Sequence, residues 1–324
     1  MDSEDKQEKV TSGLLGFAVA DALGVPIEFT SRWSHQEEPL TEMVGYGSHD
    51  VPAGTWSDDT SMTIATMDSI GETRTIDYDD IMKKYCLWAF KAQYTATGKV
   101  FDIGNGTGKA LSSYRDHITT AVESGGKDVY SNGNGSLMRM LPIAFYAFYR
   151  NLSDEEITEV VDSYSGMTHG HPISKLGCHI YCDFIRYLLE GKNKEEAFDL
   201  LKNHNYVDLY GDDTTSKYSR ILDGSIKGVD ISKISSSGYI VDTLEACFWS
   251  FLSSNNYENA VVTAVNLGDD TDTVGAITGS MAGVVYGKES IPKRWLDALQ
   301  RKDYLEDIAL RFSKALSARK WLWF

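Results

Sequence analysis

The chain has 324 residues, a length that suits one large domain or two modest ones. Hydrophobic residues make up 42% of it and charged residues 24%, as in an average globular protein, so wholesale disorder is excluded. The 47 acidic residues outnumber the 31 basic ones and give a net charge of −16, which argues against nucleic-acid binding through counterion release. Such a surface suits a protein that binds cations, or one that screens an anionic ligand with a metal.

The N-terminal segment is acidic and lacks the basic and apolar regions of a signal peptide. No apolar run approaches the roughly 20 residues needed to cross a bilayer, so we expect no membrane partner. Without a secretory signal, we expect a cytoplasmic protein in which Cys86, Cys178, Cys182 and Cys247 are reduced thiols. We also expect the chain to act as a monomer.

The chain reads mostly as helices, after an acidic segment over residues 1–12 that we expect to be flexible. Apolar patterns, helix caps and closing glycines predict helices over residues 13–24, 58–71, 78–94, 137–149, 154–165, 173–191, 194–203, 241–254, 256–267, 274–287 and 291–316. No run alternates over the length of a strand, and no internal repeat or low-complexity linker divides the chain. We therefore predict a single all-α domain over residues 13–324.

Two of these helices are rich in small residues. The small residues recur at helical spacing in each, as Gly16, Ala20 and Gly24 in the first and Gly275, Gly279 and Gly283 in the second. Small side chains allow two helix axes to approach at the closer end of the usual range of about 8–10 Å. The two helices could therefore meet face to face and join the ends of the chain. The alternative is that these glycines and alanines are only tolerant core positions.

Two short segments concentrate carboxylates and hydroxyls at the start of apolar helices: GTWSDDTSM over residues 54–62 and GDDTDTVG over residues 268–275. A single aspartate in such a place would be a helix N-cap, which needs only one oxygen. The three carboxylates between Asp269 and Asp272 exceed that need and would repel one another without a counter-charge. Alternating Asp270 and Asp272, with hydroxyls between and after them, is the oxygen-rich spacing that hard cations favour.

Three further features are candidates for ligand binding or proton transfer. The segment YSNGNGS over residues 130–136 leads into a buried helix and could seat a pyrophosphate on exposed amides; a plain glycine-rich turn is the alternative. His169 and His171 could ligate a transition metal, but entry into a helix before a proline is the commoner reason for such a pair. Glu28 follows a buried helix among apolar neighbours, which would raise its pKa and suit it to proton transfer; a surface acid in a loop is the alternative.

Taken together, these segments resemble the ADP-ribosylglycohydrolase family. The matching features are GLLGFAVADALGVPIEF, GTWSDDTSM, FDIGNGT, SNGNGSLMRMLPIA, THGHP and GDDTDTVGAITGSMAG, which occur in the family's order from residue 13 to about residue 287. The resemblance implies a compact, single-domain orthogonal helical bundle with two Mg²⁺ or Mn²⁺ ions near its centre. It also implies an enzyme that cleaves the N- or O-glycosidic bond between ADP-ribose and a modified protein side chain.

The resemblance further implies roles for individual residues. The metal ligands would be Ser57, Asp58, Asp59, Asp270, Asp272 and Thr273. The ADP-ribose phosphates would lie in the loop formed by Ser131, Asn132, Gly133, Asn134 and Gly135, with His169 near the diphosphate. Glu28 matches the family's mobile glutamate near the metals and, with the metal-bound Asp58, would move protons to the leaving group. Asp269 stands where the family commonly has glycine, and we expect it to lie outside the ligand set.

The FDIGNGT segment contains a candidate for substrate selection. Asp102 resembles an aspartate that lies beside the substrate guanidinium in the arginine-directed branch of the family. A carboxylate can pair bidentately with a guanidinium, whereas a serine-linked substrate offers no such cation. Arginine-linked ADP-ribose is therefore the expected substrate. The alternative is that Asp102 only opens a helix toward Leu111.

Functions from three classes are compatible with these residues. The first is a hydrolase in which two ions would hold the ribose hydroxyls and a water, lower the pKa of that water and orient it toward C1″. The second is an inactive relative that binds ADP-ribose or a partner, against which the intact carboxylates at all five acidic positions argue. The third is a metal-dependent phosphodiesterase, which usually requires histidine ligands. The resemblance favours the first.

Overall fold

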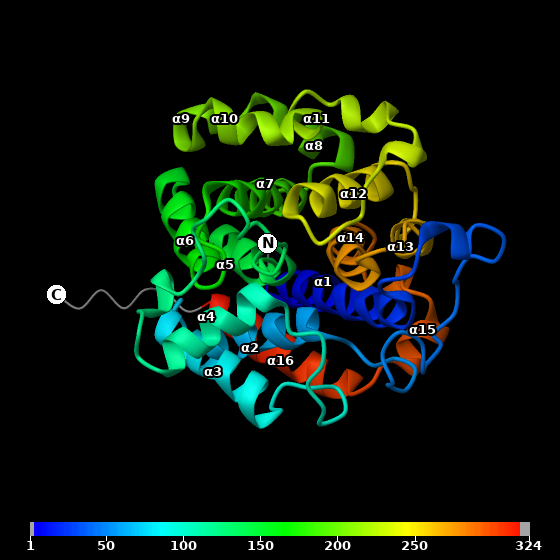
Figure 1. The fold of residues 1–324 in the computed structure, drawn as a ribbon, viewed down its shortest axis with the longest axis horizontal. Helices are drawn as coiled ribbons and strands as arrows, with labels where there is room; N and C mark the ends of the chain where they lie inside the picture. The colour runs from blue at the N-terminus through cyan, green and yellow to red at the C-terminus, as the bar shows by residue number, and fades with distance from the viewer. Residues whose placement is uncertain (1–2, 318–324) are drawn as a thin grey trace.

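Helix α1 (Ser3–Gly24) runs through the middle of the fold, and every residue from Ser12 to Gly24 is buried (Figure 1). The computed structural model describes residues 3–317. The helix begins at Ser3 instead of residue 13, so residues 3–12 of the segment expected to be flexible are helical. From the sequence we expected no apolar run long enough to cross a bilayer. In the structure, however, Ser3–Ile27 is long and apolar enough to do so by length and composition alone. Because 94% of its most apolar window is buried inside the protein, it serves as a core helix.

The second small-residue helix, α14 (Thr271–Tyr286), packs lengthwise against α1. A Cβ atom built on Gly16 would lie 2.5 Å from the carbonyl oxygen of Gly279, closer than real side chains come to backbone. A Cβ on Gly24 would lie equally close, at 2.5 Å, to the backbone nitrogen of Asp272. The predicted face-to-face contact is therefore confirmed, and it brings the end of α1 against the start of α14.

We expect Gly279→Ala to destabilise the protein by about 1–3 kcal/mol, the usual cost of forcing extra volume into a packed core. The added methyl group would press on the backbone of Gly16 and on the side chain of Ala20, neither of which can move without shifting α1. Urea unfolding measures the loss. Gly71→Ala is the matched control, because Gly71 is also helical but its Cβ would meet nothing closer than 3.6 Å. The control should be neutral or more stable, since alanine favours helices over glycine.

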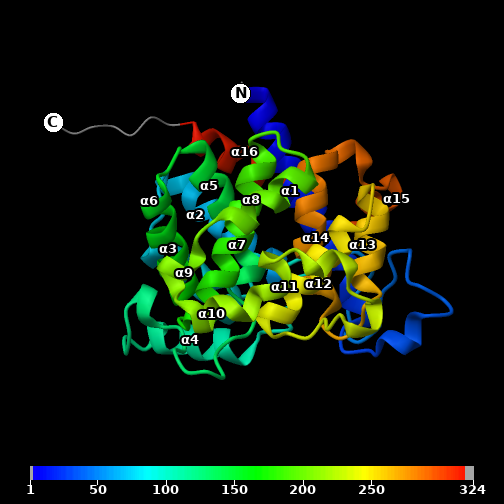
Figure 2. The ribbon, with the colours of Figure 1, turned by 90° about the horizontal axis from the view of Figure 1, so that it is seen from above.

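The other helices are arranged around this central pair (Figures 1 and 2). Helices α2 (Asp58–Thr73) and α16 (Lys302–Leu316) pack against α1, and α3 (Tyr78–Lys91) packs against α2. Helices α12 (Ile240–Leu252) and α13 (Tyr257–Val265) pack against α14. Helix α7 (Pro172–Leu189) contacts α12 and is flanked by α5 (Leu141–Tyr149), α6 (Asp154–Gly166) and α8 (Lys194–Asn203). The shorter helices are α4 (Asn105–Arg115), α9 (Tyr206–Tyr210), α10 (Asp212–Thr215), α11 (Ser219–Leu222) and α15 (Lys293–Ala298).

The all-α prediction is confirmed, because the described residues contain helices and isolated bridges but no strand. Two predicted helices are divided. The 137–149 segment forms a 3₁₀ turn, Leu137–Arg139, before α5, because Pro142 occupies the first turn of α5 and cannot donate a hydrogen bond to a preceding turn. The 291–316 segment breaks at Arg301, whose φ of 54° is left-handed and ends any continuous helix there.

Candidate active site

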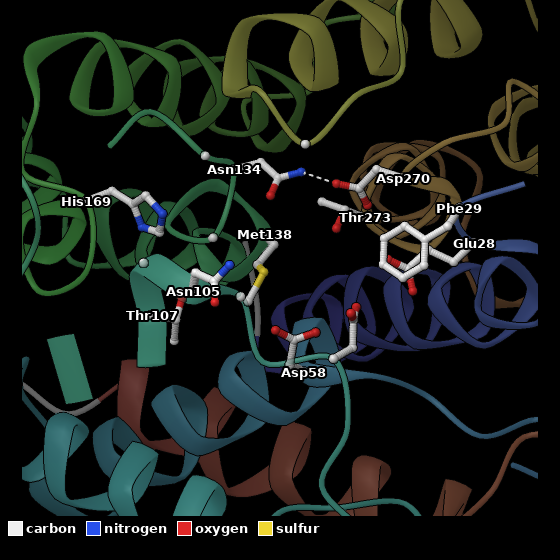
Figure 3. A pocket seen from close by; sticks show the side chains of 16 residues that line it. Glu28, Phe29, Asp58, Asn105, Thr107, Asn134, Met138, His169, Asp270 and Thr273 are labelled. Carbon is white, nitrogen blue, oxygen red and sulfur yellow. Dashed lines mark hydrogen bonds between the residues drawn. The ribbon is translucent and has the colours of Figure 1, made fainter. Parts of the chain in front are cut away.

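A pocket opens where three helices present their N-termini, those of α2, α4 and α14 (Figure 3). The residues that line it are Glu28, Phe29, Asp58, Asp102, Gly104, Asn105, Gly106, Thr107, Gly133, Asn134, Gly135, Met138, His169, Gly238, Asp270 and Thr273. Figure 3 shows carboxylates gathered on one side and His169 on the other. We call these the acidic end and the histidine end. Helix N-termini carry partial positive charge, so all three favour anionic groups in the pocket.

The acidic end brings together carboxylates from four separate parts of the chain. Single ligand atoms of Asp21, Asp59 and Asp272 lie within 4.8 Å of one another, and so do those of Glu28, Asp270 and Asp272. The two groups share Asp272. Hydroxyls link the two helix starts, since Ser57 donates to Asp59 Oδ2 at 3.0 Å and Thr273 donates to the same oxygen at 3.3 Å.

Helix capping does not account for these acids. The N-cap of α2 is Ser57, whose hydroxyl accepts from the amide of Asp59. At the start of α14, Asp270 occupies the N-cap position, but its side chain makes no capping hydrogen bond. It accepts instead from Asn134 Nδ2 at 2.6 Å, across the pocket (Figure 3). The carboxylates are therefore available for another role.

Three buried carboxylate oxygens at the acidic end, Asp59 Oδ1, Asp270 Oδ1 and Asp272 Oδ2, have no hydrogen-bond partner among the described residues. Burial, and then neighbouring carboxylates, raise the pKa values of Asp58, Asp59 and Asp272 well above the usual range. Buried oxygens without donors are costly, and bound cations are the usual remedy for clustered carboxylates. The residues present therefore fit a metal centre of hard, oxygen-ligated cations.

Asp21 belongs to this site, although the sequence analysis missed it. Its carboxylate accepts from the amide of Ser57 at 2.9 Å, from the amide of Thr60 at 3.1 Å, and from the Thr60 hydroxyl at 2.6 Å. These bonds hold the first turn of α2 against α1 and so orient Asp58 and Asp59. Burial raises the pKa of Asp21 to about 7. The available signal was a lone acid inside the otherwise apolar run of the first helix.

Glu28 is fixed at the edge of the acidic end by the loop after α1. The amide of Phe29 donates to the Asp269 carbonyl at 2.7 Å, and the amide of Asp269 donates to the Thr30 carbonyl at 2.9 Å. These two bonds, between Asp269 and two consecutive residues, bring Glu28 beside the start of α14. The Glu28 carboxylate also contacts His49 Nε2 at 2.5 Å. Burial, followed by the charges of nearby aspartates, raises the pKa of Glu28 to about 11. The prediction of a buried acid is confirmed, while Asp269 itself is exposed.

At the histidine end, a hydrogen-bond chain orients His169. Arg139 Nη2 donates to Thr168 Oγ1 at 2.7 Å, which frees the hydroxyl hydrogen of Thr168 for His169 Nδ1 at 2.9 Å. The proton of the neutral ring is then on Nε2. Burial and the Arg139 charge lower the pKa of His169 to about 3, so the ring stays neutral. A Cβ on Gly135 would lie 2.8 Å from the ring, which is why this position suits glycine.

Arg139 was not singled out in the sequence. It is fully buried, lies over the rings of Tyr85 and Tyr164, and forms no salt bridge with any carboxylate in the described part of the chain. A buried cation without an acid partner favours an anionic ligand nearby. The first turn of α4, from Asn105 to Thr107, faces the same end of the pocket.

The predicted phosphate loop is only partly in the pocket. Gly133, Asn134 and Gly135 line it. Ser131 donates to Asp128 Oδ2 at 2.8 Å, and Asn132 accepts from the Ser174 hydroxyl at 3.0 Å, so both side chains are engaged outside the pocket lining. The second histidine of THGHP, His171, is the N-cap of α7, as the helix-entry interpretation has it. All the predicted metal ligands lie at the acidic end.

Comparison with known proteins agrees with this architecture. A family model described as ADP-ribosylglycohydrolase matches residues 2–321. The ADP-ribosylarginine hydrolase Tri1 of Serratia proteamaculans (strain 568) is 32% identical over 302 residues, covering 93% of this chain and 78% of that protein. The ADP-ribosyl-[dinitrogen reductase] glycohydrolase of Rhodospirillum rubrum is 28% identical over 301 residues, covering 91% of each. A solved structure described as an ADP-ribosylglycohydrolase-related protein complex has a TM-score of 0.80 and 29% identity, covering 97% of this chain and 100% of that one.

Fold, site and relatives together define an all-α hydrolase of glycosidic bonds. The chain belongs to the ADP-ribosylglycohydrolase family, as its sequence motifs predicted.

Proposed function

We propose that this protein is a dinuclear-metal hydrolase that releases ADP-ribose from a modified arginine side chain of a protein. The observation that carries the proposal is the set of three donor-free carboxylate oxygens on Asp59, Asp270 and Asp272. They lie with Glu28 at one end of a pocket whose far end suits a diphosphate. The names of the relatives from Serratia and Rhodospirillum support ADP-ribosylated proteins as the substrate class.

The metal site we propose uses Ser57, Asp58, Asp59, Asp270, Asp272 and Thr273, all from the starts of α2 and α14. When bound there, two Mg²⁺ or Mn²⁺ ions would anchor the ribose hydroxyls and activate a water. Asp21 orients the first turn of α2 and so keeps its acids in place. The ions would also offset the surplus of acidic charge in a protein of net charge −16 that binds a dianionic ligand.

The chain's own side chains divide the remaining work between the two ends of the pocket. His169 Nε2–H and the amides at the start of α4 would hold the diphosphate, and the buried charge of Arg139 behind Thr168 would favour an anion at this end. Glu28, together with Asp58, would deliver the proton that the leaving guanidine needs as the bond to C1″ breaks. Positioning both ends of the substrate fixes C1″ beside the acidic end.

Incubation with an ADP-ribosyl-arginine peptide and Mg²⁺ tests the proposal directly. We expect free ADP-ribose and unmodified peptide as products, and no release in EDTA. Binding of ADP-ribose without turnover would instead identify an inactive binding module. Release of AMP would identify a phosphodiesterase, since that reaction cuts the diphosphate and leaves the glycosidic bond intact.

Asp102 is the candidate determinant of the arginine linkage. Its side chain lies in the pocket, and its carboxylate is within 4.8 Å of ligand atoms of Glu28 and His49. We expect Asp102→Ala to raise the KM for the arginine-linked substrate by about tenfold or more, the worth of one charge-assisted contact, and to spare any serine-linked activity. Steady-state kinetics on the two peptides measures the difference. If the wild type cleaves serine peptides and leaves arginine peptides untouched, the arginine assignment is wrong, although a glycohydrolase activity would stand.

A further inference from the structure

A second cluster of metal-ligating side chains lies between the middle of α7 and the end of α8, and none of its members lines the pocket. His179 and Asp183 are one turn apart on α7, and His204 ends α8. His179 Nε2 lies 3.5 Å from Asp183 Oδ2, and His204 Nδ1 lies 3.8 Å from the same oxygen. His179 and Asp183 are buried, whereas 21% of the His204 side chain is exposed. The cluster is thus formed inside the protein and is reachable from solvent through His204.

Hydrogen bonds fix the tautomer of His179. The phenol of Tyr210 donates to Asp162 Oδ1 at 2.8 Å, because a carboxylate can only accept. The same phenol oxygen therefore accepts from His179 Nδ1 at 3.0 Å. In the neutral ring the other nitrogen, Nε2, then carries a lone pair.

The lone pair of His179 Nε2 consequently faces another acceptor. Asp183 is held in place by Arg186, which donates to Oδ1 at 2.8 Å, and by Tyr206, which donates to Oδ2 at 2.8 Å. Neither bond supplies a hydrogen between Asp183 and the two imidazoles. In the neutral ring, the Nε2 lone pair and the Asp183 oxygen 3.5 Å away are both electron-pair donors that a cation between them would engage.

We propose that His179, Asp183 and His204 bind a first-row transition-metal dication of the zinc type. Two imidazoles and one carboxylate form a donor set that binds Zn²⁺ with a fourth position left for water, whereas the all-oxygen acidic end of the pocket suits Mg²⁺ or Mn²⁺. The supporting hydrogen bonds match what bound histidines and carboxylates require, since Tyr210 orients His179, and Arg186 and Tyr206 orient Asp183. Such an ion would tie the end of α8 to α7.

Cobalt and zinc titrations of the full-length, metal-stripped protein test this site. The titrations are carried out with saturating Mg²⁺, which occupies the acidic end. We expect one equivalent of Co²⁺ to give visible d–d bands, and one equivalent of Zn²⁺ to displace it. A wild type without such bands would overturn the proposal, whatever the behaviour of any variant.

His204→Ala, followed by calorimetric Zn²⁺ titration, is the direct variant. We expect it to lose at least tenfold in Zn²⁺ affinity and to lose the rise in Tm that Zn²⁺ gives the wild type. His117→Ala removes an exposed histidine outside the cluster and should bind Zn²⁺ like the wild type. Tyr210→Phe removes the acceptor for His179 Nδ1, together with the bond that the phenol donates to Asp162, and should cost about 10–100-fold in affinity. Equal Zn²⁺ affinity in the wild type and His204→Ala would overturn the assignment.

Discussion

Asp272→Asn should abolish the release of ADP-ribose while the protein stays folded. Asp272 belongs to both groups of converging carboxylates, and its Oδ2 is one of the oxygens without a donor. The amide keeps the shape but removes the charge that a divalent ion needs. We expect turnover to fall by at least about 10²–10³-fold, the cost of removing one group that stabilises developing charge. Asp270→Asn should behave in the same way. Product release at saturating Mg²⁺ measures both.

The control for this prediction is Asp212→Asn. Asp212 lies in a segment with nearly the same letters, Gly-Asp-Asp-Thr, but it is exposed on the short helix α10 and should leave turnover unchanged. In EDTA, Asp272→Asn should be at least as stable as the wild type, because it relieves repulsion between buried carboxylates. Mg²⁺ should raise the Tm of the wild type more than that of the variant. Full activity of both Asp270→Asn and Asp272→Asn would refute the two-metal proposal.

The sequence predicted structure best where a residue type occurs in a pattern that has one physical explanation, as for the spaced glycines and the clustered aspartates. Glycines spaced along two helices predicted the α1–α14 contact, because only small residues allow backbones to approach so closely. Acids in excess of what a helix cap needs predicted the acidic end. In the structure the Asp270 side chain makes no capping bond, and Asp272 uses only Oδ1 for the amide of Thr273, which leaves Oδ2 without a donor. Because α1 and α14 pack together, the loop that carries Glu28 meets the start of α14. Glu28 and the aspartates of α14, which the sequence suggested separately, therefore belong to one site.

Contacts between distant segments could not be predicted from residue patterns. The partners of Asp21 lie 36 and 39 residues further along the chain, so its role as a clamp on α2 depends on tertiary packing. In the sequence, Arg139 is one polar residue in an apolar segment. It lies behind His169 because it donates to Thr168, in the loop that connects α6 to α7. For Ser131 the contact that mattered is local. Its hydroxyl donates to Asp128, three residues earlier, and is therefore not part of the pocket lining. The roles of the individual site residues stay predictions.

Glu28→Gln should cut turnover by about 10²–10⁴-fold, the usual worth of a positioned acid or base. Glutamine keeps the size of the side chain and can still hydrogen-bond to His49, but it cannot exchange a proton with the leaving group. Because the diphosphate would be held at the opposite end of the pocket by His169, the affinity for ADP-ribose should change little. Single-turnover rates and calorimetric binding separate these two effects. The control is Glu38→Gln, because Glu38 is an exposed acid further along the loop that follows α1.

The pattern of the two measurements decides what Glu28 does. A large fall in rate with unchanged ADP-ribose affinity is the signature of a group that acts in the transition state, since a ground-state contact would weaken binding as well. A parallel loss of rate and affinity would make Glu28 a substrate ligand and leave proton transfer to Asp58. A fall of less than about tenfold would make Glu28 a bystander, because a positioned acid or base contributes far more than that. The contact with His49 and the backbone bond from Phe29 to the Asp269 carbonyl hold Glu28 at the acidic end, and this favours the first result.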